Sequence, residues 1–479
     1  MKSLAKIDQT FVWHPFTQML DWLKHEPIVI LSGRGAVLRD TRGREYLDAN
    51  SSIWTNLHGH CHPKINAAIT RQLKKISHSS ALGLANEPAS LLAEKLVRAA
   101  NPPSSRPALN KVFFSDDGST ALEVALKLAY EFTRRIRGKK SHPRFLSLAG
   151  AYHGDTIGAV SLGHIGLFHQ AYGGLLFPAD AVMSPYCYRC PFNRARPERA
   201  DARSYRRCNW ECVDKVEQKC AGQKKKGNPY AAFVFEPRLQ GAAGVIPQPE
   251  GWLPRVAEIT RAQGTLLIAD EVMTGFGRTN SNVKTGKTQP NLFACQEEKV
   301  RPDFLCLAKG LTGGYLPMAA TLTTQAVFDA FLGEYEEFKT FFHGHSYTGN
   351  QLGAAAGLAS LDILQSPDSI AARQRLEELL HQELQALWRL PGVGDIRQSG
   401  LVAGIELVKN WQTREPFDLR ERIGIRVCEA MARRGVLTRP IGNVIMLMPP
   451  YCITPKQLHK MVSALAESIA EVLGKPVST

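Results

Sequence analysis

Short apolar runs, each closed by a polar or glycine residue, recur through residues 111–310, and longer amphipathic segments separate them. The runs occupy residues 111–115, 144–150, 231–237, 265–272 and 304–310. This alternation is typical of a doubly wound α/β fold with a mostly parallel central sheet. Such sheets bind their ligands at the carboxyl ends of the strands. The polar residues at those ends are therefore the first candidates for a site: Asp116, Asp117, Glu236, Asp270 and Lys309.

The remaining parts of the chain have a different pattern. Helical periodicity over residues 370–387, 422–434 and 456–473, around short strands, predicts a smaller α+β domain. Near the start, VLRDTRGREYLD indicates a β-hairpin with its turn at Arg42 and Gly43, and we expect it to pack with that domain. The predicted organisation is an N-terminal segment (residues 1–75), a large domain (76–345) and a C-terminal small domain (346–479).

The composition indicates a globular protein, with 44% hydrophobic and 22% charged residues among 479. No apolar stretch approaches the roughly 20 residues of a membrane-spanning helix. The start, MKSLAKIDQTFVWHPF, lacks the apolar run of a secretory signal. We therefore expect a cytoplasmic protein with no membrane partner.

The net charge of +15, from 59 Lys and Arg against 44 Asp and Glu, raises the possibility of an acidic partner such as nucleic acid. Residues 189–226 hold twelve basic and five acidic residues, so nearly half of the excess lies in one segment rich in turn residues. We interpret this segment as a solvated excursion. A nucleic-acid-binding protein is the non-enzyme alternative, but no known nucleic-acid-binding motif supports it.

The same excursion, taken as residues 187–226, carries a cluster of cysteines. Cys187, Cys190, Cys208 and Cys212 have a spacing that could close a tetrahedral zinc site. The other interpretation is a set of free thiols, because no catalytic-looking acid lies beside them. We predict no metal, with the zinc site as the alternative.

A phosphate-binding turn is indicated where the first apolar run meets an amphipathic segment. Gly118 would let the backbone approach an anion, Ser119 adds a hydroxyl, and the N-terminus of the following helix favours negative charge. Thr120 and Glu123 have capping-box spacing, so we expect the helix to begin there. An ordinary turn is the alternative.

The ends of two further predicted strands, residues 265–272 and 304–310, supply an acid and an amine. Asp270 closes an apolar strand and needs a cationic partner, for which Lys309 is the candidate. A lysine in such a position can act as an amine nucleophile, although a structural ion pair would leave the same sequence. Together, the phosphate turn, carboxylate and amine match the three demands of pyridoxal phosphate: an anion hole, a Schiff-base amine and a carboxylate for the ring nitrogen.

Three motifs carry a resemblance to a known family. LLIADEVMTGFGRT, AYHGDT and LAKGLTGG resemble the class III pyridoxal-phosphate aminotransferases, which have fold type I. Within that class, HPFTQ (14–18), SSIW (51–54), FFHGHS (341–346), Arg439-Pro and LMPPY (447–451) resemble the diaminopelargonate synthase branch of biotin biosynthesis. That branch converts 8-amino-7-oxononanoate to 7,8-diaminononanoate by a ping-pong reaction.

The resemblance implies roles for individual residues. Catalytic roles would fall to Lys309, Asp270 and Tyr152. Those three, with Gly118, Ser119, His153, Val272 and Ser346, would bind the cofactor. Ser346 would reach the phosphate of a neighbouring subunit, which implies a homodimer with the active site at the subunit interface. Phe16, Ile53, Trp54 and Arg439 would contact substrates, and Arg439 would hold the carboxylate of the oxo acid by a bidentate pair.

The amino donor depends on two of these positions. The branch that uses S-adenosylmethionine commonly has Tyr where this chain has Phe16, and Trp where it has Ile53. The branch that uses L-lysine has the residues found here, so the sequence favours lysine. Adenosylmethionine as donor, and another class III aminotransferase acting on an ω-amino acid or a diamine, are the alternatives.

Overall fold

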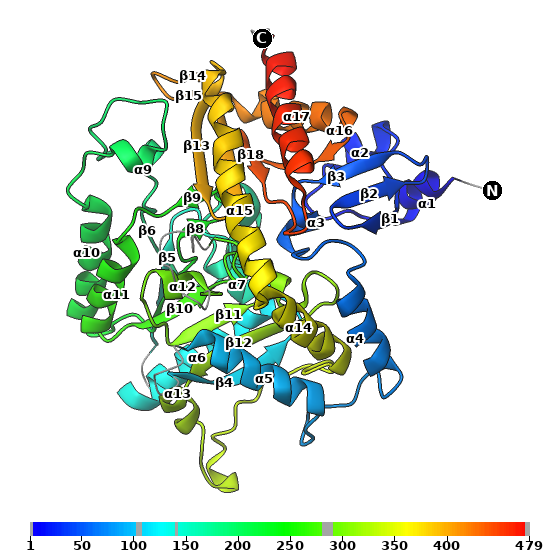
Figure 1. Ribbon diagram of the computed structural model, residues 1–479. Coiled ribbons are helices and arrows are strands. Elements are labelled where there is room, and N and C mark those ends of the chain that lie inside the picture. The colour runs from blue at the N-terminus through cyan, green and yellow to red at the C-terminus, as the bar shows by residue number, and fades with distance from the viewer. Residues whose placement is uncertain (1–2, 102–107, 139–141, 280–290, 475–479) are drawn as a thin grey trace.

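A seven-stranded sheet forms the centre of the computed structural model, which describes residues 3–101, 108–138, 142–279 and 291–474 (Figure 1). Its strands, in spatial order, are β4 (Leu109–Ser115), β12 (Ala319–Thr324), β11 (Phe304–Leu307), β10 (Leu266–Asp270), β7 (Ala232–Phe235), β5 (Phe145–Leu148) and β6 (Asp180–Val182). β12 is antiparallel to both neighbours, and the pairs from β11 to β6 are parallel. The mostly parallel sheet, and a strand in each predicted apolar run, are thus confirmed.

The sheet is covered on both faces because alternate residues of each strand point to opposite sides. On β7, Ala232 and Val234 belong to the core beneath α6 (Gly118–Arg137), whereas Phe233 and Phe235 belong to the core on the opposite face. That second core includes residues of α5 (Glu87–Ala100) and α11 (Trp252–Ala262).

The start of α6 differs from the prediction. Asp117, not Thr120, is the N-cap residue, and its side chain accepts a 2.8 Å hydrogen bond from Thr120 N. The Thr120 hydroxyl accepts in return from Asp117 N at 3.0 Å, so the capping box lies three residues earlier than expected. Glu123 instead accepts hydrogen bonds from the Thr156 hydroxyl and from Gly158 N.

Two smaller sheets flank the central one. The first consists of β1 (Ile30–Arg34), β2 (Val37–Asp40), β3 (Glu45–Asp48) and β16 (Val436–Leu437), so the predicted N-terminal hairpin pairs with a strand from near the C-terminus. The second contains β13 (Val393–Ser399), β14 (Val402–Asn410), β18 (Val444–Leu447) and β17 (Pro440–Ile441), and β15 (Glu415–Pro416) pairs with β14. The domain boundaries at residues 75 and 345 stay a prediction.

The three helices predicted near the C-terminus are α15 (Pro367–Leu384), α16 (Ile423–Arg433) and α17 (Pro455–Leu473). Two short strands, β8 (Leu239–Gln240) and β9 (Ile246–Pro247), pair with each other. The other helices are α1 (Leu4–Phe11), α2 (Met19–Lys24), α3 (Ser51–Trp54), α4 (Pro63–Leu73), α7 (Ile157–Ser161), α8 (Gly166–His169), α9 (Ala202–Tyr205), α10 (Glu211–Lys225), α12 (Ala294–Glu297), α13 (Gln325–Asp329) and α14 (Gln351–Leu364). None of the helices in the described ranges is long and apolar enough to cross a membrane.

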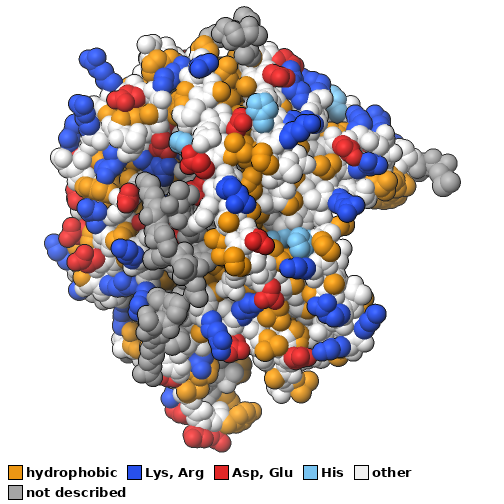
Figure 2. All heavy atoms as spheres, viewed as in Figure 1, with side chains coloured by type: hydrophobic (Ala, Val, Ile, Leu, Met, Phe, Trp, Pro, Cys, Tyr) orange, Lys and Arg blue, Asp and Glu red, His pale blue; other side chains and the backbone are white. Residues whose placement is uncertain are grey.

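The basic excursion is anchored more firmly than the sequence predicted. Arg189 donates to Glu406 on β14 at 2.6 Å, and Arg203 donates to the carbonyl oxygen of Gln398 on β13 at 2.8 Å. Arg199 donates to the carbonyl oxygen of Val393 and lies over the ring of Trp411. The interpretation of a merely solvated segment is therefore wrong for these arginines. On the face shown in Figure 2, Lys and Arg side chains lie dispersed among Asp and Glu.

The excursion meets a buried ion cluster centred on Arg397. This guanidinium, in a residue that is 1% exposed, donates to Asp395 at 3.0 Å and to Glu406 at 2.5 Å. It also donates to the carbonyl oxygen of Val245 at 2.6 Å. Arg397 thus joins the C-terminal sheet to the loop between β8 and β9, and Glu406 joins both to Arg189.

We expect Arg397→Leu to lower the free energy of unfolding by about 3–5 kcal/mol, because it leaves buried carboxylates without their main cation. The matched control is Arg194→Ala, which removes an exposed arginine paired with Glu211 and should cost about 0.5 kcal/mol or less. Thermal unfolding of both variants measures the difference. Equal shifts in the two variants would contradict the anchoring role of Arg397.

Candidate active site

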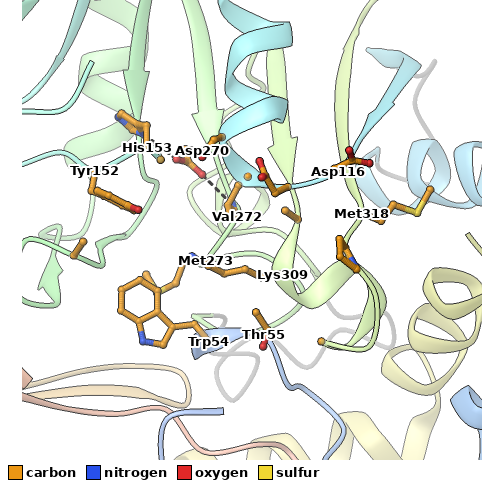
Figure 3. Close-up of a pocket in the computed structure, with 18 of the residues that line it drawn as sticks. Trp54, Thr55, Asp116, Tyr152, His153, Asp270, Val272, Met273, Lys309 and Met318 are labelled. Atoms are coloured by element: carbon orange, nitrogen blue, oxygen red, sulfur yellow. Dashed lines mark hydrogen bonds and ion pairs between the residues drawn. The ribbon is translucent and has the colours of Figure 1, made fainter. Parts of the chain in front are cut away.

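Adjacent parallel strands bring the predicted acid and amine to one edge of the sheet. Asp270 ends β10 and lies in register with Cys306 on β11. Lys309 follows β11 by two residues and opens a short 3₁₀ turn. Both side chains line a cavity of about 440 Å³ (Figure 3).

The direct partner of Asp270 is a histidine. His153 Nδ1 lies 2.7 Å from Asp270 Oδ2, and both residues are buried. The second carboxylate oxygen accepts a 3.0 Å hydrogen bond from Val272 N. The predicted Asp270–Lys309 contact is replaced by these bonds, since no direct ion pair joins the two side chains in the described structure. His153 holds the carboxylate in place, so the acid keeps a fixed position in the cavity wall.

Lys309 has the properties of an amine nucleophile. Burial lowers the pKa of Lys309, while the nearby carboxylates of Asp270 and Glu236 oppose that shift. Its ammonium nitrogen lies 4.7 Å from the ring centroid of Trp54. Its φ of 38° is a left-handed conformation that costs a non-glycine residue about 1 kcal/mol or more. Strain of this kind clusters at functional sites, which agrees with a reactive role.

The phosphate turn opens on the same cavity. Gly118 and Ser119 form the first turn of α6, whose N-terminus favours an anion. A Cβ atom at Gly118 would lie 2.7 Å from Cγ1 of Val272, so no other residue fits there without movement. Gly154 has a φ of 127°, and a Cβ atom there would collide with the Ser119 hydroxyl. Gly118 thus lets the start of α6 lie against Val272, and Gly154 lets its own loop lie against Ser119.

Tyr152 forms one side of the cavity. Its hydroxyl donates to Asp155 at 2.7 Å, and burial is the main reason that the pKa of Tyr152 is raised. Phe16 packs edge-on against this ring, with centroids 6.4 Å apart, although 57% of Phe16 is exposed. Trp54 and Val272 line the cavity, as the sequence predicted.

Four predicted residues do not line this cavity, and Phe16, which contacts Tyr152, is one of them. Ile53 is exposed beside Trp54, and Arg439 is exposed between β16 and β17. Ser346 is also exposed, and its carbonyl oxygen accepts a hydrogen bond from His78 at 2.7 Å. Their predicted roles toward substrate or a second subunit stay predictions.

Several cavity residues were given no role from the sequence. The sequence indicates Glu236 only as the end of a strand, yet in the structure it lies in the cavity wall and is 6% exposed. Glu236 follows β7 directly, and Asp270 ends the adjacent strand β10, in which Ala269 is paired with Phe235, so a comparison of strand ends could have assigned it. Met273, Tyr315 and Met318 also line the cavity, and the sequence carried no signal for them.

No cysteine of the excursion forms a disulfide in the described structure. Burial raises the pKa of Cys187 and Cys212 to about 12, which opposes thiolate formation. Cys190 and Cys208 are partly buried, and Arg206 donates to the sulfur of Cys208. Across the described ranges, no group of three or more His, Cys, Asp or Glu is arranged to hold a metal ion, and both interpretations of these cysteines stay predictions.

Comparison with known proteins agrees with this geometry. Residues 21–469 match the family described as Aminotransferase class-III. The chain belongs to this family. It is 46% identical to the adenosylmethionine-8-amino-7-oxononanoate aminotransferase of Geobacter sulfurreducens over 99% of this chain and 98% of that protein.

Solved structures give the same result. The crystal structure of the Methanocaldococcus jannaschii protein of that name has 41% identity and a TM-score of 0.86, covering 98% of both chains. An amine transaminase from an uncultivated Pseudomonas species, solved with bound pyridoxal phosphate, has 33% identity and a TM-score of 0.84. It covers 96% of this chain and 98% of that one.

The aminotransferase is pyridoxal-phosphate-dependent, and its residues fit the cofactor. Lys309 would supply the amine, Asp270 the carboxylate for the ring nitrogen, and Gly118 with Ser119 the phosphate turn. When bound, the cofactor withdraws electrons from the carbon that carries the reacting amine. His153 fixes Asp270, and Tyr152 and Val272 form walls that would flank the ring.

We expect Lys309→Ala to remove both turnover and the visible absorption band of the lysine-bound cofactor, because no other lysine lines the cavity in the described residues. Absorption spectra and a transamination assay measure the two effects. Lys309→Arg is the control that keeps the charge without the imine-forming amine, and it should also lose the band. Retained turnover in either variant would contradict the role of Lys309.

Proposed function

We propose that the enzyme converts 8-amino-7-oxononanoate to 7,8-diaminononanoate, an amination in biotin biosynthesis. The observation that carries this proposal is the full-length similarity to proteins named for that substrate, at 46% and 42% identity in two of them. The cavity supports it because it holds one lysine amine, Lys309, and two buried acids, Asp270 and Glu236, which favour an amine-bearing substrate.

In this reaction Lys309 moves the protons. Its amine takes the proton that leaves the amine-bearing carbon of the donor in the first half-reaction. In the second, it gives a proton to the carbon that carried the oxo group. Asp270, fixed by His153, keeps its carboxylate toward the ring nitrogen in both halves. Because the product of the first half-reaction leaves before the oxo acid binds at the same site, we expect ping-pong kinetics.

The proposed active unit is a homodimer. Ser346 would reach the phosphate in the neighbouring subunit, which explains why its side chain is exposed and outside the cavity of its own chain. Large apolar side chains near it are also exposed: Leu82 (91%), Phe342 (74%) and Tyr347 (61%). Exposed apolar side chains gathered in this way mark an interaction surface.

The substrate proposal predicts a clear preference. The enzyme should aminate 8-amino-7-oxononanoate, with little activity toward β-alanine, 4-aminobutyrate or putrescine. In the same assay, Arg439→Ala should raise KM for the oxo acid roughly tenfold to a hundredfold, because a bidentate pair with its carboxylate is lost. The KM for the amino donor should change little. Preference for one of the alternative amines would support the rival ω-amino acid or diamine aminotransferase, which the similarity to an amine transaminase favours.

For the amino donor we propose L-lysine, on the basis of Phe16 and Ile53. Phe16 contacts the ring of Tyr152 without a hydroxyl to offer, and Ile53 lies beside Trp54. The relative from Geobacter sulfurreducens is instead named for adenosylmethionine. Single-turnover spectra of the holoenzyme distinguish the two, since lysine alone should convert the cofactor to its amine form. Conversion by adenosylmethionine and not by lysine would reverse the choice.

A further inference from the structure

Glu236 is a second acid in the cavity, and half of its carboxylate has no partner. Its Oε2 accepts a 2.8 Å hydrogen bond from Gly241 N. Its Oε1 is buried and has no hydrogen-bond partner among the described residues. An unpaired buried carboxylate oxygen is costly, so its retention in the wall of a substrate cavity indicates a ligand that completes it.

The other buried acid next to Asp270, Glu271, differs from Glu236 because both of its carboxylate oxygens have hydrogen-bond partners. Its two oxygens accept hydrogen bonds from Ala294 N at 2.6 Å and Cys295 N at 2.8 Å. Glu271 does not line the cavity. Burial raises the pKa of both Glu236 and Glu271 to about 7. The two acids therefore share burial and differ in the free oxygen and in access to the cavity.

The charged groups around Glu236 do not balance, because this end of the cavity holds more acids than lysine amines. His153 is bonded to Asp270 through Nδ1, and Lys309 comes from the end of the next strand, β11. Two acids, Glu236 and Asp270, thus share this end of the cavity with one lysine amine. In the proposed function, Asp270 serves the ring nitrogen of the cofactor. Glu236 is then the acid available to a substrate.

We propose that Glu236 recognises the amino group of 8-amino-7-oxononanoate, with Oε1 accepting a hydrogen bond from that group. The inference rests on the proposed function. The substrate carries this amino group on the carbon next to the carbonyl that reacts, so the group must lie near Lys309 when the carbonyl does. A carboxylate in the same wall can accept a hydrogen bond from an ammonium group at that place. A substrate without the amino group would not gain this hydrogen bond.

The proposal has a consequence for proton release. With a pKa near 7, most Glu236 carboxyl groups are protonated at pH 6 in the free protein. An ammonium bound at Oε1 favours the charged form and lowers this pKa, so binding releases a proton from Glu236. Affinity for the amino-bearing substrate therefore rises as the pH rises through about 7. The charged groups near Glu236 also act on its pKa: His153 and Lys309 lower it, and Asp270 raises it.

The kinetic test compares 8-amino-7-oxononanoate with 7-oxononanoate, which has the same carbonyl and carboxylate without the amino group. In the wild-type holoenzyme, kcat/KM should favour the amino-bearing substrate by roughly tenfold to a hundredfold. Glu236→Gln should bring that ratio close to 1, and Glu271→Gln should leave it unchanged. An unchanged ratio in Glu236→Gln would overturn the proposal.

A binding measurement needs neither turnover nor a mutation. Calorimetry on the cofactor-free full chain at pH 6, in buffers of different ionisation enthalpy, should find more proton release with 8-amino-7-oxononanoate than with 7-oxononanoate. Equal release would overturn the role of Glu236. The proposed function fails separately, if the wild-type holoenzyme aminates neither compound.

Discussion

The register between β10 and β11 places a carboxylate and an amine at the same edge of a parallel sheet. Asp270 is paired with Cys306, and Lys309 lies three residues beyond it. Both are surrounded by apolar strands, so neither charge is well solvated. The amine gains reactivity from this burial, and the acid is kept in position by His153 at 2.7 Å. The chemistry of the site follows from the placement of these two charges.

The cavity also depends on segments far from the sheet in sequence. Trp54 lies in α3, which begins at Ser51, and the Ser51 hydroxyl donates to the carbonyl oxygen of Met448 at 2.6 Å. Met448 N in turn donates to the carbonyl oxygen of Ala49. Arg397 holds the loop around Val245, and Ala242 of the same loop lines the cavity. The N- and C-terminal parts of the chain therefore position walls of the cavity, and the central sheet places Asp270 and Lys309 in it.

Much of the fold was predictable because local patterns agree with tertiary structure. The apolar runs are strands, since alternate residues pack into two cores and their polar ends gather at one edge. The strand ends predict that Asp270 and Lys309 lie at the same edge of the sheet, which is where the structure places them. The start of α6 was misplaced by three residues because Asp117 and Thr120 both suit a cap, and only the backbone decides between them.

Other features depend on contacts that the sequence does not encode locally. His153 is bonded to Asp270 across 117 residues of chain, so charge arguments alone selected Lys309 as the partner. The excursion was interpreted as solvated because its acceptors, Glu406 and the carbonyl oxygens of β13, lie about 200 residues away. Glu236 resembled the other strand ends, and its free oxygen became apparent only in the folded structure.

The central claim is that the amine of Lys309 carries the cofactor, and borohydride reduction of the holoenzyme tests it most directly. Reduction fixes the cofactor to the lysine that holds it, and peptide mass spectrometry then locates the modified residue. The account predicts one modified lysine per chain, at position 309. A modification at another lysine, or none in a protein that binds the cofactor, would contradict it.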